Sequence, residues 1–73
     1  MNQSKCARLR SVIARHAVLA GAETKKAQAE RALIEKQRYC RRIKNPGAFT
    51  LDDLENISRA FKIPWSEIAE ALS

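Results

Sequence analysis

Residues 24–44 read TKKAQAERALIEKQRYCRRIK and decide the fold. Thr24 is a good helix N-cap, and it precedes a run of helix-forming residues from Lys25 to Ala32. The Leu33-Ile34-Glu35 step interrupts this pattern, and a second helical run extends from Lys36 to Lys44. The stretch therefore predicts two short helices joined by a tight turn.

The second of these helices has two unlike faces. Tyr39 and Ile43 are four residues apart and share one face. The other face carries Lys36, Gln37, Cys40, Arg41 and Lys44. Lysine, glutamine and arginine on a helix with an apolar back suit the major groove of DNA. A basic helix face is also common as plain solvated surface, so the rest of the chain must decide between these interpretations.

Composition favours a single small all-helical domain over residues 1–73. Apolar residues make up 45% of the chain, and many of them are alanine, which predicts a thin core of closely packed helices. Two glycines and two prolines punctuate the sequence, and stretches rich in β-branched residues are few. Sheet is therefore not expected.

Charge is distributed unevenly along the chain. The net charge is +6, yet residues 1–44 hold 12 Lys or Arg against 3 Glu, and residues 45–73 hold 2 against 5 acidic residues. A basic first part predicts a face suited to a polyanion, with nucleic acid as the leading candidate. An anionic membrane surface is less favoured because no segment combines a wide apolar face with aromatic anchors.

Several other classes are not expected. Cys6 and Cys40 form no C-x-x-C pair and His16 lacks a matching ligand set, so we expect no metal and no cofactor. We expect a reduced, cytoplasmic protein, with a disulfide between the two cysteines as the less favoured alternative. The basic N-terminal region does not resemble a signal peptide, and no stretch reaches the roughly 20 apolar residues of a membrane span. With one histidine and no glycine-rich phosphate loop, an enzyme is not expected either.

Punctuation along the chain predicts five helices. Ser4 is expected to cap the first, and Gly21 to end it. Asn45-Pro46-Gly47 should stop the third, and Thr50 with Asp53 resembles a capping box for the fourth. The expected helical ranges are 4–20, 24–32, 36–44, 50–61 and 64–72.

Helical periodicity also predicts which residues are buried. His16 is expected at the boundary of the core, and Trp65 is expected in the core, with a dimer contact as the alternative. The remaining predicted core residues are Leu9, Ile13, Ala17, Ala20, Ala29, Ala32, Leu33, Ile34, Tyr39, Ile43, Phe49, Leu51, Leu54, Ile57, Phe61, Ile68 and Leu72.

Over residues 5–72 the order of these parts resembles the lambda-repressor-like helix-turn-helix family of phage Cro and repressor proteins and their XRE-like bacterial relatives. Thr24 with Lys25, the small Ala29, and Ile34 after the turn carry the resemblance, together with Tyr39 and Ile43. The run RRIKNPGAFTLDDLENISRAFKI, residues 41–63, is similar to a prophage-associated branch of that family.

Three residues depart from the family pattern. Gln28 stands where an apolar residue is usual, and Leu33 where glycine is usual, so docking of the second helix is expected to be shifted or looser. Glu35 replaces a serine-like cap, although its negative charge still suits a helix N-terminus. Near DNA its carboxylate would either accept from a cytosine amino group or repel phosphates.

The resemblance implies a compact five-helix domain that binds double-stranded DNA in a sequence-specific way, as a small Cro/repressor-like (Cro/C1-type) transcription regulator of phage or prophage origin. Its third helix would enter the major groove, with Gln37 pairing with adenine, Arg41 with guanine and Cys40 contacting a thymine methyl. The implied base-edge residues are Lys36, Gln37, Cys40, Arg41 and Lys44, and the implied phosphate contacts are Lys25, Lys26, Arg38 and Arg42. A homodimer is expected, formed through the last helix and Trp65 or only on the operator.

A protein-interaction module on the same fold is the main alternative. An antitoxin, anti-repressor or adaptor would dock its basic face on an acidic protein, and Glu35 with the missing turn glycine favours this alternative slightly. RNA binding is less favoured, because Tyr39 is the only aromatic residue of the basic region and is expected in the core.

Overall fold

A computed structural model describes residues 2–73, and these residues form five α-helices and no strand. The expected all-helical class is therefore confirmed, and each expected helical range agrees with the structure to within one residue at either end. The elements are α1 (Gln3–Leu19), α2 (Lys25–Ala32), α3 (Lys36–Lys44), the 3₁₀ turn η1 (Pro46–Ala48), α4 (Leu51–Phe61) and α5 (Trp65–Leu72).

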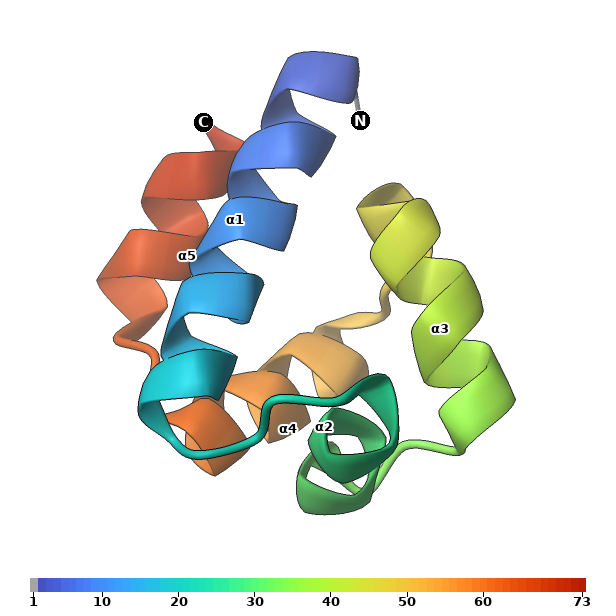
Figure 1. The fold of residues 1–73 in the computed structure, drawn as a ribbon. Coiled ribbons are helices and arrows are strands. Elements are labelled where there is room, and N and C mark those ends of the chain that lie inside the picture. Colours follow the sequence, from blue (N-terminus) through green and yellow to red (C-terminus); the bar gives the residue numbers. More distant parts are fainter. Residues whose placement is uncertain (1) are drawn as a thin grey trace.

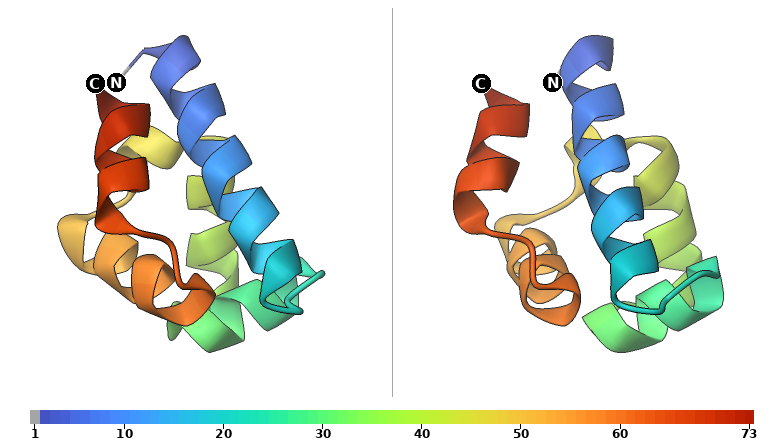
Figure 2. Two further views of the ribbon diagram at one scale, coloured as in Figure 1. Left: turned by 90° about the vertical axis from the view of Figure 1, so that its left-hand side faces the viewer. Right: turned by 60° about the vertical axis from the view of Figure 1, so that its left-hand side comes forward.

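The helices surround a small core (Figure 1). Helix α1 packs along α5 and also contacts α4, while α2 packs against both α3 and α4. Two further views show the ends of α1 and α5 close together (Figure 2), where the Arg8 guanidinium donates to the carbonyl of Ser73 at 3.0 Å. None of the helices in residues 2–73 is long and apolar enough to cross a membrane.

Side-chain caps start most of the helices. Thr24 Oγ1 accepts from the backbone N–H of Ala27 at 3.1 Å, and Thr50 and Asp53 form the expected capping box. The prediction for Ser4 was wrong, because Asn2 caps α1 by accepting from Lys5 N–H at 2.8 Å. Asn2 has the extended backbone that a cap requires, so the helix begins early and leaves Ser4 within its first turn.

Left-handed residues end three helices. Gly21 has φ of +85°, as expected for a glycine after a helix. Leu33 and Lys62 also adopt this conformation, with φ of +58° and +55°. The prediction that Leu33 faces inward was wrong, since its side chain is 79% exposed. The left-handed turn directs Leu33 to solvent and brings Ile34 into the core, where its N–H donates to Ala29 O at 3.0 Å.

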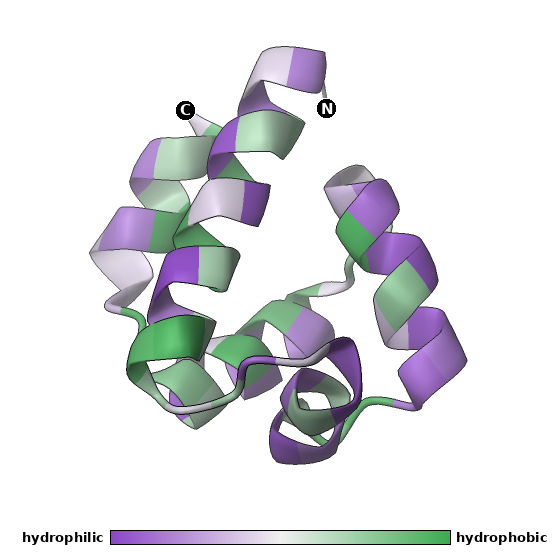
Figure 3. Cartoon of the chain, viewed as in Figure 1, coloured by the Kyte–Doolittle hydropathy of each residue, from purple (hydrophilic) through white to green (hydrophobic). Residues whose placement is uncertain are grey.

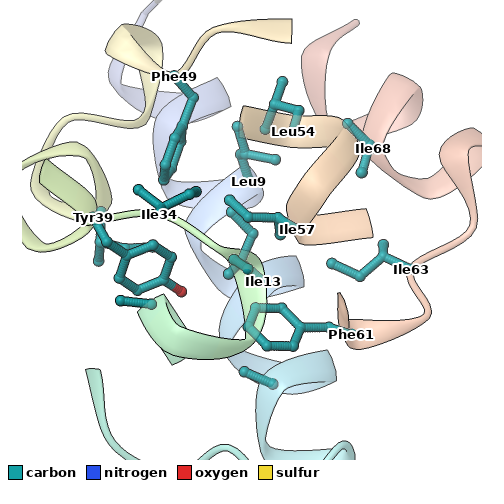
Figure 4. Packing of buried hydrophobic residues seen from close by; sticks show 14 of the residues in the cluster. Leu9, Ile13, Ile34, Tyr39, Phe49, Leu54, Ile57, Phe61, Ile63 and Ile68 are labelled. Carbon is teal, nitrogen blue, oxygen red and sulfur yellow. The ribbon is translucent and has the colours of Figure 1, made fainter. Parts of the chain in front are cut away.

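The core is thin and rich in alanine, as composition predicted. Large side chains from α1, α3, α4, α5 and the connections meet at its centre (Figure 4), and α2 adds two small alanines, Ala29 and Ala32. Hydrophobic and hydrophilic residues alternate along the helices (Figure 3), which is the pattern of helices with one buried side. The buried set is Leu9, Ile13, Ala17, Ala22, Ala29, Ala32, Ile34, Tyr39, Ile43, Phe49, Leu54, Ile57, Phe61, Ile63, Ile68 and Ala71.

Two bulky residues predicted in the core are at the surface. Leu51 is 72% exposed and Trp65 is 46% exposed. Each is the first residue of its helix, three positions before the first buried apolar residue of that helix. Leu54 and Ile68 occupy the inward positions instead, and for that reason both predictions were wrong.

Candidate nucleic-acid interface

Helix α3 presents a polar face away from the core. Lys36, Gln37, Arg41 and Lys44 are exposed, and Cys40 is half-buried. On the opposite side Tyr39 and Ile43 are buried, which fixes this short helix to the rest of the domain. All five predicted base-edge residues therefore lie on one helix, whose buried residues hold it in place.

Glu35 caps the start of α3. Its carboxylate accepts from the backbone N–H of Gln37 at 2.8 Å and of Arg38 at 3.1 Å. The Gln37 hydrogen bond is the main cause that holds the pKa of Glu35 below its ordinary value of 4.5. Both carboxylate oxygens accept hydrogen bonds from the first turn of α3. Glu35 therefore caps this helix as a serine-like residue would.

A buried hydrogen-bond chain joins α3 to α2 and to the loop before it. The Tyr39 hydroxyl donates to Gln28 Oε1 at 2.7 Å, and Gln28 Nε2 donates to the carbonyl of Ala22 at 3.1 Å. Both side chains are buried, and burial raises the pKa of Tyr39 above its usual range. The hydroxyl therefore remains a neutral donor, and polar Gln28 is accommodated because each end of its amide has a partner.

Arg38 and Arg42 are both bound to Asp53 of α4. Arg38 Nη2 donates to Asp53 Oδ1 at 2.8 Å, and Arg42 Nη1 donates to the other carboxylate oxygen. Asp53 is only 2% exposed, and burial by itself would raise its pKa. The Thr50 N–H and the two guanidinium groups stabilise the charged carboxylate more strongly, so the pKa lies below its ordinary value of 3.8. The three side chains together carry one net positive charge beside α3.

Lys25 and Lys26 lie at the start of α2 and are exposed. Within residues 2–73 neither lysine takes part in an ion pair. Their ammonium groups stand where the unpaired N–H groups of the helix already favour an anion. Of the four predicted phosphate contacts, these two are thus available as full charges, while Arg38 and Arg42 are shared with Asp53.

Sequence reasoning missed the role of Arg10. From α1, its Nε donates to the carbonyl of Ile43 at 2.8 Å and its Nη2 donates to that of Lys44 at 3.0 Å. These carbonyls belong to the last turn of α3, which lacks partners within the helix. No sequence signal links positions 33 and 34 residues apart, so this contact emerges only from the fold.

The remaining chemistry-bearing residues lie elsewhere. Cys6 and Cys40 are free and half-buried, on α1 and α3. His16 lies at the core boundary, as expected, with Nε2 at 2.8 Å from Glu67 of α5. Among the residues that the structure describes, no cluster of three histidine, cysteine or acidic side chains could hold a metal ion.

Comparisons with protein-family models, with curated proteins and with solved structures find no match.

Proposed function

We propose that this protein binds double-stranded DNA in a sequence-specific way, with α2 and α3 acting as a helix-turn-helix. The observation that carries the proposal is the outer face of α3, which offers long polar side chains on a helix whose other side is locked into the core. A helix fits the major groove, where each base pair presents its own pattern of donors and acceptors. A helix fixed from behind can hold its side chains in register with that pattern.

Base reading is assigned to the exposed face of α3. Gln37 would make paired hydrogen bonds to an adenine, and Arg41 would make them to a guanine, each worth roughly 1–3 kcal/mol of discrimination. Lys36 lies at the same end of the helix as Gln37 and is a further donor for base edges. Half-buried Cys40 would contribute a small neutral contact, such as one to a thymine methyl.

Phosphate contacts would set the register of the protein on the duplex. Lys25 and Lys26 bring full positive charges to the start of α2, the helix that packs against α3. Arg38 and Arg42 keep N–H groups beyond those bound to Asp53 and can donate these to a phosphate. Their contribution to the salt dependence of binding is expected to be smaller than that of the two lysines, since Asp53 offsets one charge.

The biological role proposed for this binding is that of a small Cro/repressor-like transcription regulator from a phage or prophage. One such domain covers few base pairs, so two copies on adjacent half-sites would raise specificity. Trp65, partly exposed at the start of α5, is the contact proposed between the two copies. Dimerisation on the operator alone would serve the same purpose.

Selection from a random duplex DNA pool tests the proposal. The wild-type protein should enrich a two-fold symmetric motif at moderate salt. Gln37→Ala and Arg41→Ala should each relax the preference at defined base pairs and retain non-specific affinity. Lys62→Ala, at the exposed end of α4, is a matched control that should leave the motif unchanged. Enrichment of no motif would refute sequence-specific binding.

A protein-interaction module is the second candidate function. Leu33 is a large apolar side chain that is 79% exposed at the turn between α2 and α3, and DNA offers it little to contact. An acidic protein partner could cover Leu33 together with the basic face. Weak retention on DNA that is the same for every sequence and falls steeply with salt would favour this candidate.

A further inference from the structure

A polar groove separates the first half of α1 from the end of α3. Figure 1 shows the N-terminal half of α1 beside the last turn of α3, to which Arg10 is hydrogen-bonded. The groove between these segments reaches Asn45, the residue before η1. Its lining residues are Gln3, Ser4, Cys6, Ala7, Arg10, Lys44 and Asn45. None of these residues is acidic, so the charged groups of the groove are both positive.

Arg10 is held in place on one wall of this groove. Its Nε and Nη2 are bound to the carbonyls of Ile43 and Lys44, and its Nη1 makes no hydrogen bond within residues 2–73. Arg10 also has no carboxylate partner in that part of the chain, unlike Arg38 and Arg42. A guanidinium fixed by two carbonyls loses little conformational freedom when a further ligand binds, which favours affinity.

The start of α1 adds a second source of positive potential. Gln3 and Ser4 belong to the first turn, where backbone N–H groups have no partner within the helix. Asn2 takes only the N–H of Lys5, and the first turn contains no acidic residue to offset the helix dipole. The helix start, Arg10 and Lys44 thus border one groove and favour one anion.

We infer that this groove binds a backbone phosphate of the duplex that lies on α3. This inference rests on the proposed function and extends the interface from α3 to α1. The nine residues of α3 span about 13 Å, and the major groove is about 12 Å wide. A helix that crosses this groove brings its C-terminal end to one sugar-phosphate strand. Lys44, predicted to read bases, is here reassigned to that phosphate.

Neutral phosphates in the selected operator provide the test. Methylphosphonate is placed at one backbone position at a time, and affinities are measured for wild type and Arg10→Gln. Glutamine keeps an N–H donor for the α3 carbonyls but removes the charge. We expect one backbone position at which the methylphosphonate weakens DNA binding by the wild-type protein but not by the Arg10→Gln variant. The slope of log affinity against log salt should also fall by about 0.9 in this variant.

Controls separate a lost phosphate contact from lost structure. Arg8→Gln removes an exposed α1 charge that faces α5 instead of the groove. In this variant each methylphosphonate should reduce the affinity as much as it does for the wild-type protein. If Arg10→Gln unfolds, Lys44→Gln replaces it, because Lys44 is exposed and its substitution should leave the fold intact. A methylphosphonate at the same backbone position should then no longer reduce the affinity of the variant. The inference would be overturned if the slope of log affinity against log salt is unchanged, or if every methylphosphonate that weakens wild-type binding weakens binding by the variant equally.

A second measurement does not depend on a selected motif. On addition of a mixed-sequence duplex, the Nε–H resonance of Arg10 and the amide resonances of Gln3 and Ser4 should shift. If these resonances shift although selection yields no motif, the groove inference survives and the sequence-specific function fails. If a motif is selected and these resonances stay fixed, the groove inference alone fails.

Discussion

Because Tyr39 and Gln28 share a buried hydrogen bond, the effects of substituting them on the free energy of unfolding should not be additive. Tyr39→Phe removes the hydroxyl that donates to Gln28 Oε1 at 2.7 Å and leaves that oxygen without a donor. Gln28→Leu leaves the Tyr39 hydroxyl and the Ala22 carbonyl without their partners. Because Tyr39 is fully buried and Gln28 is 7% exposed, water cannot easily replace the lost hydrogen bonds.

The expected losses follow from the number of groups left unpaired. Each buried polar group without a partner costs about 1–3 kcal/mol. Tyr39→Phe should therefore lower the free energy of unfolding by about 1–3 kcal/mol, and Gln28→Leu by at least as much. In the double variant only the Ala22 carbonyl remains unpaired. Its loss should be smaller than the sum of the single losses by at least about 2 kcal/mol, because two fewer buried groups are left unpaired.

Urea unfolding followed by circular dichroism measures these differences. A chain of 73 residues should have a free energy of unfolding of about 4–11 kcal/mol, so losses of this size shift the midpoint clearly. Gln37→Leu changes an exposed glutamine of α3 and serves as the control, with an expected effect within about 0.5 kcal/mol. Additive losses in the double variant, or a Tyr39→Phe protein as stable as wild type, would refute the reasoning.

Two further predictions concern backbone strain and pH. Leu33→Gly should raise the free energy of unfolding by about 0.5–1 kcal/mol, because Leu33 is left-handed and its side chain is mostly exposed; Lys62→Gly should act similarly, and a loss in thermal or urea unfolding would contradict the argument. The hydrogen bond to His16 is the main cause that holds the pKa of Glu67 below 4.5. The contribution of ionised Glu67 to folding stability is therefore complete above pH 4.5 and disappears as the pH falls through the lowered pKa. Glu67→Gln should therefore unfold at a lower temperature than wild type near neutral pH and at the same temperature in strong acid, with Glu70→Gln unchanged relative to wild type throughout.

Local signals in the sequence predicted the helices well. Caps at Thr24 and Thr50 and the break at Gly21 depend on residues within a few positions of each other. Such signals act through the local backbone, so they are readable before the fold is known. The same reasoning placed Tyr39 and Ile43 behind α3 and the five residues predicted to read bases on its front.

Periodicity was less reliable at helix ends. It placed Leu33, Leu51 and Trp65 in the core, although all three are exposed. Each lies at a cap or at the first position of a helix, where the direction of a side chain depends on how the chain enters or leaves the helix. A pattern of spacing carries no information about that direction.

By itself the sequence determined the all-helical class, the helix boundaries and the polar face of α3, because these depend on residues near one another in the chain. Only the tertiary structure decided which polar groups are partners. Asp53 binds the two arginines of α3 predicted to hold phosphates, and Arg10 binds the last carbonyls of the same helix from α1. Hydrogen bonds between distant segments follow from how helices pack, and packing depends on the whole core at once.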